Sequence, residues 1–140
     1  NYNLDTTEIA MRAFVLGDLL VYQQKYNEAI IKYDSVLIAF SGHTLTDEIY
    51  LRKSEIYYLK NKYDLALSEL KRIEEDWSYD ILADDALYTR AKIYENILDD
   101  MNNAMLLYEK ILLEHSSSIF VAESRKRFRE LRGDNLKTEE

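Results

Sequence analysis

The sequence predicts an all-α protein in which seven helices form three stacked hairpins and a C-terminal capping helix. Three observations predict this class. The 140 residues contain no proline and three glycines, whereas a sandwich or barrel needs many turn-forming residues. Apolar residues recur at helical spacing, as in Phe14, Leu16 and Leu20, and the alternation typical of strands is missing throughout. The third observation is an internal repeat.

The internal repeat has a period of 37 to 38 residues, and its clearest column holds Ala29, Ala66 and Ala104. Five further columns agree in chemistry, namely Gly17, Ser54 and Ala91; Tyr26, Tyr63 and Met101; Tyr33, Leu70 and Tyr108; Val36, Ile73 and Ile111; and Ser41, Ser78 and Ser116. The small residues allow paired helices to approach closely, and the large ones fill the space between them. Because one hairpin cannot bury its apolar stripe alone, we expect three stacked copies to share one core.

The repeat organises the chain as a single repeat domain with copies at about residues 6–43, 44–80 and 81–117. We expect helices at 6–23, 27–39, 47–59, 64–75, 81–97 and 102–114. A capping helix at 119–132, within the segment 118–133, would precede a flexible tail at 134–140. Its inner side would hold Phe120, Val121, Ser124, Phe128 and Leu131. Candidate helix caps are Asp5 with Glu8, Thr44 with Asp47, and Ser117 with Ser118.

The columns also carry a family resemblance. Copy one contains the step Leu16-Gly17, followed by Tyr26, Ala29 and Tyr33. The matching residues are Ser54, Tyr57, Tyr63 and Ala66 in copy two, and Ala91, Tyr94, Ala104 and Tyr108 in copy three. From about Ala10 to Ser116, this pattern resembles the tetratricopeptide repeat. The resemblance implies a right-handed α-solenoid and a role as an interaction module.

The copies depart from that family in three ways. Their period exceeds the family's ~34 residues, with extra residues near 41–46, near 77–80 and near Asp99. Serines replace the family's closing proline. Lys53 and Arg90 occupy the column in which copy one has Leu16. We expect these departures to change the loops and not the helices.

A second resemblance concerns the third copy and the tail. The segments 82–87 and 119–134, the latter ending in Leu-Arg-Gly-Asp, are similar to C-terminal repeats of large multi-repeat proteins of the bacterial cell envelope. This resemblance implies a parent protein that is periplasmic or associated with the outer membrane. The chain opens at Asn1 without a signal-peptide pattern, and we expect it to be a segment of a longer protein.

In the fold that the first resemblance implies, the first helices line a concave groove, which is the candidate partner-binding surface. Its candidate residues are Phe14, Asp18 and Tyr22 from copy one, Leu51, Glu55 and Tyr58 from copy two, and Tyr88, Lys92 and Glu95 from copy three. Phe14, Leu51 and Tyr88 are spaced by 37 residues and would form an apolar ladder. Such a surface suits an amphipathic helix or extended peptide with apolar anchors and some positive charge. The alternative is that the ladder packs against neighbouring first helices and is buried.

The charge balance limits the kind of partner. The chain carries 26 acidic and 18 basic side chains, a formal charge of −8, which argues against a nucleic-acid binder. No apolar run reaches the ~18 residues that cross a bilayer. The last helix carries a basic run of Arg125, Lys126, Arg127, Arg129 and Arg132. This run either contacts an acidic partner or lipid head groups, or is the solvated face of the cap.

The sequence lacks the patterns that catalysis and cofactor binding require. Cysteine is absent, no glycine-rich loop could hold a phosphate, and no serine lies in a Gly-x-Ser-x-Gly elbow. His43 and His115 have no partner histidine at metal-ligand spacing, and Asp84-Asp85 fits no calcium loop. We therefore expect no cofactor, no metal and no enzymatic activity. Trp77 is expected to pack under a loop or to be an exposed contact anchor.

Two functions follow from these observations. The first is a non-enzymatic protein–protein interaction scaffold that binds a partner protein or peptide through the groove or the end faces. The second is a structural spacer or self-association element of a longer solenoid. A mass in sedimentation that rises with concentration would favour self-association, and mutations in the groove that abolish partner binding would favour the scaffold.

Overall fold

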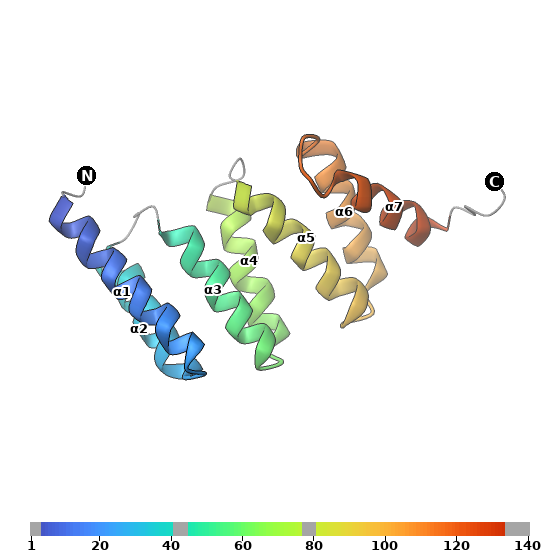
Figure 1. Cartoon of the computed structure of the whole chain (residues 1–140). Coiled ribbons are helices and arrows are strands. Elements are labelled where there is room, and N and C mark those ends of the chain that lie inside the picture. Colours follow the sequence, from blue (N-terminus) through green and yellow to red (C-terminus); the bar gives the residue numbers. More distant parts are fainter. Residues whose placement is uncertain (1–3, 41–44, 77–80, 134–140) are drawn as a thin grey trace. The chain divides into compact units, whose positions relative to one another are not determined.

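The computed structural model describes residues 4–40, 45–76 and 81–133, and these residues form α-helices joined by turns, with no strand among them (Figure 1). The helices are α1 (Leu4–Tyr22), α2 (Tyr26–Ala39), α3 (Thr46–Leu59), α4 (Tyr63–Asp76), α5 (Ile81–Asn96), α6 (Met101–Glu114) and α7 (Val121–Arg132). The predicted all-α class and the seven helices are confirmed. The predicted limits differ most at α1, which begins at Leu4 instead of residue 6, and at α7, which begins at Val121 instead of residue 119.

The later start of α7 arises because the serines before it form a turn. The amide of Ser118 donates to the carbonyl of His115 at 2.9 Å, and Ser118 Oγ accepts from the amide of Phe120 at 3.1 Å. Phe120 is the N-cap residue of α7 and makes no side-chain cap. The prediction that Ser117 and Ser118 cap this helix is therefore wrong, because both residues precede its N-cap.

Capping at the other helices also differs in part from the prediction. Leu45 is the N-cap residue of α3 and makes no side-chain cap, and Asp47 lies inside the first turn. Thr44 and the side chain of Asp5 lie outside the described part of the chain. The structure shows a cap at α6 instead, where Asp100 Oδ1 accepts from the amide of Asn103 at 3.1 Å.

The chain forms two compact units, residues 1–72 and 73–140. In the first unit, α1 packs on α2 and α2 packs on α3. Its core contains Tyr33 and Val36 of α2 together with Ile49 and Ile56 of α3, all of which are fully or almost fully buried. The first two helices and the third therefore share one apolar cluster.

In the second unit, α5 packs on α6 and α6 packs on α7. The buried core contains Leu87, Ala91, Ala104, Leu107, Tyr108 and Ile111. Val121, Phe128 and Leu131 of α7 pack against this cluster, and Ser124 is fully buried. The predicted inner side of the last helix therefore faces the core of this unit.

Burial confirms four of the six repeat columns. The alanine column and the column of Gly17, Ser54 and Ala91 are buried, as the close approach of paired helices requires. The large members are also buried, namely Tyr33, Leu70 and Tyr108, and Val36, Ile73 and Ile111. In the column of Tyr26, Tyr63 and Met101 the tyrosines are half-buried and Met101 is exposed, and Ser116 is exposed as well. Ser41 and Ser78 lie outside the described residues.

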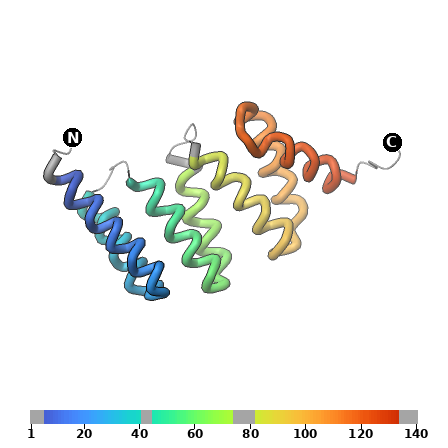
Figure 2. Tube along the Cα trace, in the orientation of Figure 1, coloured from blue at the N-terminus to red at the C-terminus, as the bar shows by residue number. Residues whose placement is uncertain are grey.

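Each hairpin turn contains one residue in the left-handed conformation. These residues are Gln24, Asn61 and Asp99, with φ of 61°, 60° and 53°, and their spacings of 37 and 38 equal those of the alanine column. In the first turn, the amide of Lys25 donates to the carbonyl of Leu20 at 2.8 Å, which closes the end of α1. Figure 2 follows the same reversal of direction at the end of α1, α3 and α5. The turn geometry therefore repeats with the sequence.

The departure at Lys53 has a structural reason. Lys53 is buried, and its Nζ lies 2.8 Å from Asp34 Oδ1 of α2 and 3.3 Å from Glu69 Oε1 of α4. Burial alone would lower the pKa of Lys53, but the hydrogen bond to Asp34 and the charge of Glu69 outweigh it and raise this pKa. Lys53 therefore stays charged and joins α2, α3 and α4.

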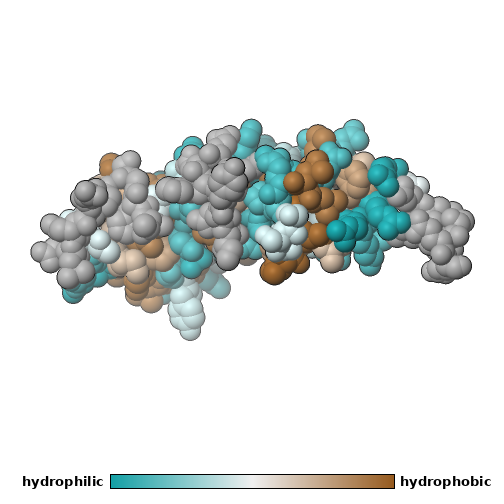
Figure 3. Space-filling model, turned by 90° about the horizontal axis from the view of Figure 1, so that it is seen from above, coloured by the Kyte–Doolittle hydropathy of each residue, from teal (hydrophilic) through white to brown (hydrophobic). Residues whose placement is uncertain are grey.

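The described helices also bear on membrane insertion and surface character. None of them combines the length and the apolar composition that crossing a bilayer requires. On the face drawn in Figure 3, apolar surface lies in separate patches between hydrophilic side chains. Trp77, His43 and the predicted tail at 134–140 lie outside the described residues.

Candidate functional site

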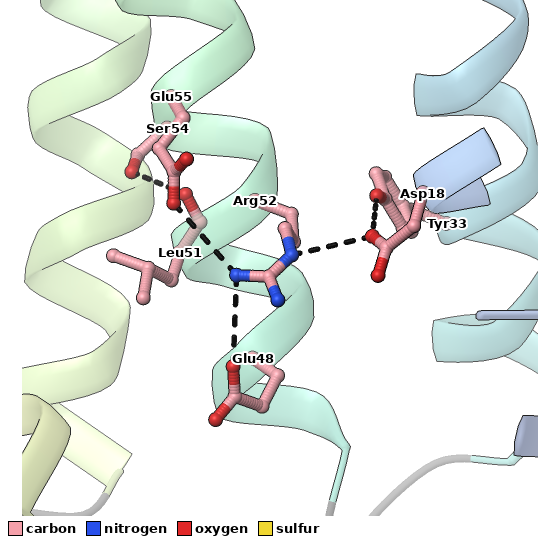
Figure 4. A network of polar contacts seen from close by, with 7 residues as sticks. All are labelled: Asp18, Tyr33, Glu48, Leu51, Arg52, Ser54 and Glu55. Atoms are coloured by element: carbon pink, nitrogen blue, oxygen red, sulfur yellow. Dashed lines mark hydrogen bonds and ion pairs between the residues drawn. The ribbon is translucent and has the colours of Figure 1, made fainter. Parts of the chain in front are cut away.

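Arg52 of α3 lies at the centre of a network of polar contacts in the first unit, which includes the candidate groove residues Asp18 and Glu55 (Figure 4). Its Nε donates to Asp18 Oδ1 of α1 at 3.2 Å. Its Nη1 lies 3.8 Å from Glu48 Oε2 and 3.8 Å from Glu55 Oε1, both on α3. One guanidinium therefore joins α1 to α3 and balances part of the charge of three carboxylates.

The charges around Arg52 shift the pKa values of this group and its neighbours. Burial alone would lower the pKa of Arg52, but the charges of Asp18 and Glu55 raise it. Partial burial raises the pKa of Glu55 against the attraction of Arg52, and the charges of Asp18 and Glu48 add to this rise. The network around Arg52 thus carries surplus negative charge, which a further basic group would reduce.

An aromatic pair lies under this polar network. Tyr33 of α2 is fully buried and donates its hydroxyl hydrogen bond to Asp18. Burial and this bond raise the pKa of Tyr33. Phe14 packs on Tyr33 with ring centroids 5.8 Å apart, and the guanidinium carbon of Arg52 lies 5.6 Å from the Phe14 centroid. These contacts fix the side chains of α1, α2 and α3 relative to one another.

The predicted site residues of the first unit differ in exposure. Phe14 is buried in the core of the unit, and Leu51 is half-buried. Tyr22 is 85% exposed near the end of α1, and Tyr58 is 44% exposed near the end of α3. Leu59, which follows Tyr58, is also exposed. The accessible part of the candidate groove therefore consists of aromatic and apolar side chains in addition to the carboxylates around Arg52.

The predicted site residues of the second unit contact the chain's own C-terminal segment. Tyr88 stacks on Phe120, with ring centroids 4.3 Å apart and an angle of 9° between the ring planes. Lys92 Nζ lies 5.9 Å from the Tyr88 centroid. Glu95 accepts hydrogen bonds from Arg127 of α7. Tyr88, Lys92 and Glu95 are thus brought together, and two of the three already have partners from residues 120–127.

Glu95 repeats the arrangement found at Asp18. Tyr108 of α6 donates its hydroxyl hydrogen bond to Glu95 Oε1 at 2.8 Å, and Arg127 donates to the same carboxylate from α7. Burial alone would raise the pKa of Glu95, but the hydrogen bonds from Arg127 and Tyr108 outweigh it and lower this pKa. In both units, a carboxylate of a first helix therefore receives a tyrosine from its hairpin partner and an arginine from the next helix.

The predicted basic run on the last helix is divided between two roles. Arg127 pairs with Glu95 and Glu130, and the guanidinium carbon of Arg132 lies 5.1 Å from the Phe128 ring centroid. Arg125, Lys126 and Arg132 are exposed. Part of the run is therefore used in packing α7, and the exposed part alone is available to an acidic partner.

The described residues offer little to a metal or a reaction. Among them, no group of three or more His, Asp or Glu side chains could hold a metal ion. His115 Nδ1 lies 2.6 Å from Asp84 Oδ1, which joins the end of α6 to the start of α5. A depression of about 280 Å³ is lined by Leu20, Glu28, Ile31, Lys32 and Ser35. The hydroxyl of Ser35 donates to the carbonyl of Lys32, so this depression holds no nucleophile paired with a base.

Comparison with known proteins assigns the third hairpin. Residues 85–118 match the family model of the tetratricopeptide repeat. This segment is a tetratricopeptide repeat. It contains most of α5, the whole of α6 and the turn that follows, and it includes the column residues Ala91, Ala104 and Tyr108. The first two hairpins share the small-residue and alanine columns with this segment. The resemblance to cell-envelope proteins stays a prediction. No curated protein matches the chain.

Sequence reasoning did not place three residues in the candidate site, namely Arg52, Phe120 and Arg127. Arg52 stands in the column of Val15, so the repeat gives no indication of its role. Phe120 and Arg127 were placed on the capping helix, but their contacts with Tyr88 and Glu95 depend on how that helix packs. One indication was available from the sequence. Tyrosine recurs as Tyr33 and Tyr108 at two of the three positions of one repeat column, which suggests a shared polar role.

Proposed function

We propose that the chain is a non-enzymatic protein–protein interaction scaffold that binds a partner protein or peptide through the groove of the first unit. The observation that carries this proposal is the combination of exposed Tyr22 and Tyr58 with surplus carboxylate charge around Arg52. A partner segment with apolar anchors and a basic residue complements both features. Tetratricopeptide repeats generally mediate protein–protein interactions, which supports a protein as the ligand.

Tyr88, Lys92 and Glu95 enter the proposal as a second contact region. Because Tyr88 stacks on Phe120 and Glu95 binds Arg127, a partner would have to share these contacts or replace them. Binding there costs more than binding to exposed side chains, since buried polar partners must be exchanged. The first unit is therefore the principal site of the proposal.

The experiment compares in-cell crosslinking and affinity capture by the full chain and by two variants. Tyr22→Glu with Glu55→Lys removes an exposed aromatic anchor and reverses a groove charge. The matched control is Ile31→Glu, which changes an apolar side chain of α2 that is 69% exposed. We expect the groove variant to lose a partner that the control retains. Retention by the groove variant together with loss by the control would contradict the proposal.

A second candidate function is a structural spacer or self-association element of a longer helical assembly. Apolar side chains exposed on α1, namely Ile9, Val15, Leu16 and Leu19, favour it. Sedimentation equilibrium distinguishes self-association from the scaffold, because a mass that rises with concentration requires contacts between copies. A protein that stays monomeric at high concentration does not self-associate. Contacts of this face with helical segments other than a second copy would then be the remaining form of this function.

A further inference from the structure

The outer face of α1, which we define as Ile9, Arg12, Leu16 and Leu19, is exposed. Its three apolar side chains are 58%, 48% and 48% exposed, in chain order. One repeat later, the same positions are held by Thr46, Ile49, Lys53 and Ile56 of α3. Of these, Ile49, Lys53 and Ile56 are buried. The repeat therefore places an exposed face on α1 where α3 has a covered one.

In the first unit, α2 covers this face of α3. Lys53 Nζ lies 2.8 Å from Asp34 Oδ1, and Lys60 Nζ donates to Asn27 Oδ1. Asn27, at the start of α2, thus contacts Lys60 at the end of α3. Asp34, further along α2, contacts Lys53 in the middle of α3. The two helices therefore run antiparallel with a fixed register.

The remaining contacts of this interface are apolar. Ile30 and Leu37 lie on the same stripe of α2 as the two polar contacts, and both pack against the cluster that contains Ile49 and Ile56. The antiparallel register places Ile30 opposite Ile56 and Leu37 opposite Ile49. The covering helix thus presents an apolar, an acidic and an apolar residue in succession.

The outer face of α1 differs from the α3 face at the residue that would lie opposite the middle position of the covering helix. Leu16 stands where α3 has Lys53. A carboxylate in the place of Asp34 would therefore be buried against an apolar side chain without an ion-pair partner, which costs free energy. The helix that fits the outer face needs an apolar residue at this position.

The outer face of α1 also differs from the α3 face at the residue that would lie opposite the last position of the covering helix. Arg12 stands where α3 has Ile49, and its Nη2 lies 2.7 Å from Glu8 Oε1 in an exposed ion pair. An acidic residue in the place of Leu37 would give Arg12 a second carboxylate in a less solvated setting. Leu19 keeps the apolar character of Ile56, so the position opposite it stays apolar.

We propose that the outer face of α1 docks the amphipathic second helix of another helix hairpin, with apolar, apolar and acidic residues opposite Leu19, Leu16 and Arg12. This inference rests on the second candidate function and does not depend on the groove. The α2 helix of a second copy does not fit, because it presents Asp34 and Leu37 in the reverse order. That α2 is also covered by its own α3.

The test attaches a covering helix to the N-terminus of the full chain through a flexible glycine–serine linker. The matched helix is the sequence of residues 26–39 with Asp34→Leu and Leu37→Glu, and the unmatched helix is the same sequence unchanged. Amide hydrogen exchange of residues 9–19, followed by NMR, reports docking. With the millimolar local concentration that such a linker gives, we expect exchange about tenfold slower with the matched helix than in the unfused chain.

Two variants of the fused protein complete the test. Leu16→Glu with Leu19→Glu is expected to restore the exchange rates of the unfused chain. Ile31→Glu in α2 of the full chain, with the attached helix left unchanged, is expected to keep the exchange slow. Equal slowing by both helices would overturn the assigned residue pattern, and no slowing by either would overturn the docking face. Slow exchange in the unfused chain that increases with protein concentration would assign the face to a second copy and also overturn the proposal. None of these variants alters the groove, so each outcome is separate from that of the proposed function.

Discussion

A β-carbon placed on Gly17 of α1 would lie 2.4 Å from Cε1 of Tyr33 in α2. The two helices therefore approach each other at a distance that glycine alone allows. Tyr33 is fully buried, and its hydroxyl is held by Asp18, so its ring has little freedom to withdraw. At this position the small-residue column of the repeat is most restrictive.

Gly17→Ala is expected to destabilise the protein by about 1–3 kcal/mol, because the added methyl group overlaps the Tyr33 ring. The helix propensity of alanine offsets about 1 kcal/mol of this cost. Urea denaturation followed by circular dichroism measures the change. In a Tyr33→Leu background, which copies Leu70 of the second repeat, the cost of Gly17→Ala should shrink. A Gly17→Ala protein as stable as the wild type would contradict the close approach.

Lys53→Met is expected to destabilise the protein by about 3–5 kcal/mol, because it leaves the buried carboxylate of Glu69 without its cation. Adding Glu69→Gln should recover part of this loss, since the remaining buried group is then neutral. Urea denaturation of the two variants and the wild type supplies the comparison. If the double variant were less stable than Lys53→Met, Lys53 would not act as the partner of Glu69.

Gln24→Gly is expected to stabilise the protein by about 1 kcal/mol, because glycine adopts the positive φ of this turn without the cost that a side chain imposes. Thermal denaturation measures the effect as a higher Tm. The control is Gln23→Gly, at a neighbouring residue outside the set with positive φ, where we expect no gain. Equal Tm values for the two variants would show that the left-handed turn carries no strain.

The ion pair at Glu95 is expected to make stability depend on acid pH. The pKa of Glu95 is lowered in the folded state, so its contribution is present above the ordinary value of 4.5 and is lost as the pH falls through the lowered pKa. The unfolding free energy of the wild type should therefore fall more steeply below about pH 4.5 than that of Glu95→Gln. Urea denaturation at a series of pH values measures both slopes. Parallel curves would contradict the assignment of the pair to Glu95 and Arg127.

Much of the fold could be predicted because it depends on local rules. Helical spacing and the alanine column placed every described helix, and the extra residue near Asp99 was visible as a spacing of 38. The role of Lys53 could not be predicted, because its two carboxylate partners come from two other helices. From sequence, Lys53 in the column that begins with Leu16 looks like degeneracy of the repeat.

The candidate site was predicted less completely for a similar reason. Helical spacing placed Tyr22 and Tyr58 among the candidate groove residues, and both are exposed. The network around Arg52 and the contact of Phe120 with Tyr88 depend on packing between helices that are distant in sequence. Periodicity identifies which face a residue occupies, and it carries no information about which neighbour will cover that face.

Site-specific photocrosslinking in cells shows which face of the first unit contacts a partner. A photoreactive amino acid is introduced at Tyr22 or Tyr58 in the groove and, as matched controls, at the exposed Ile31 or Ile38 of α2. We expect a discrete adduct with a partner protein from the groove positions, which Glu55→Lys weakens, and no such adduct from α2. Adducts from the α2 positions together with none from the groove would contradict the claim that this face of the first unit binds the partner.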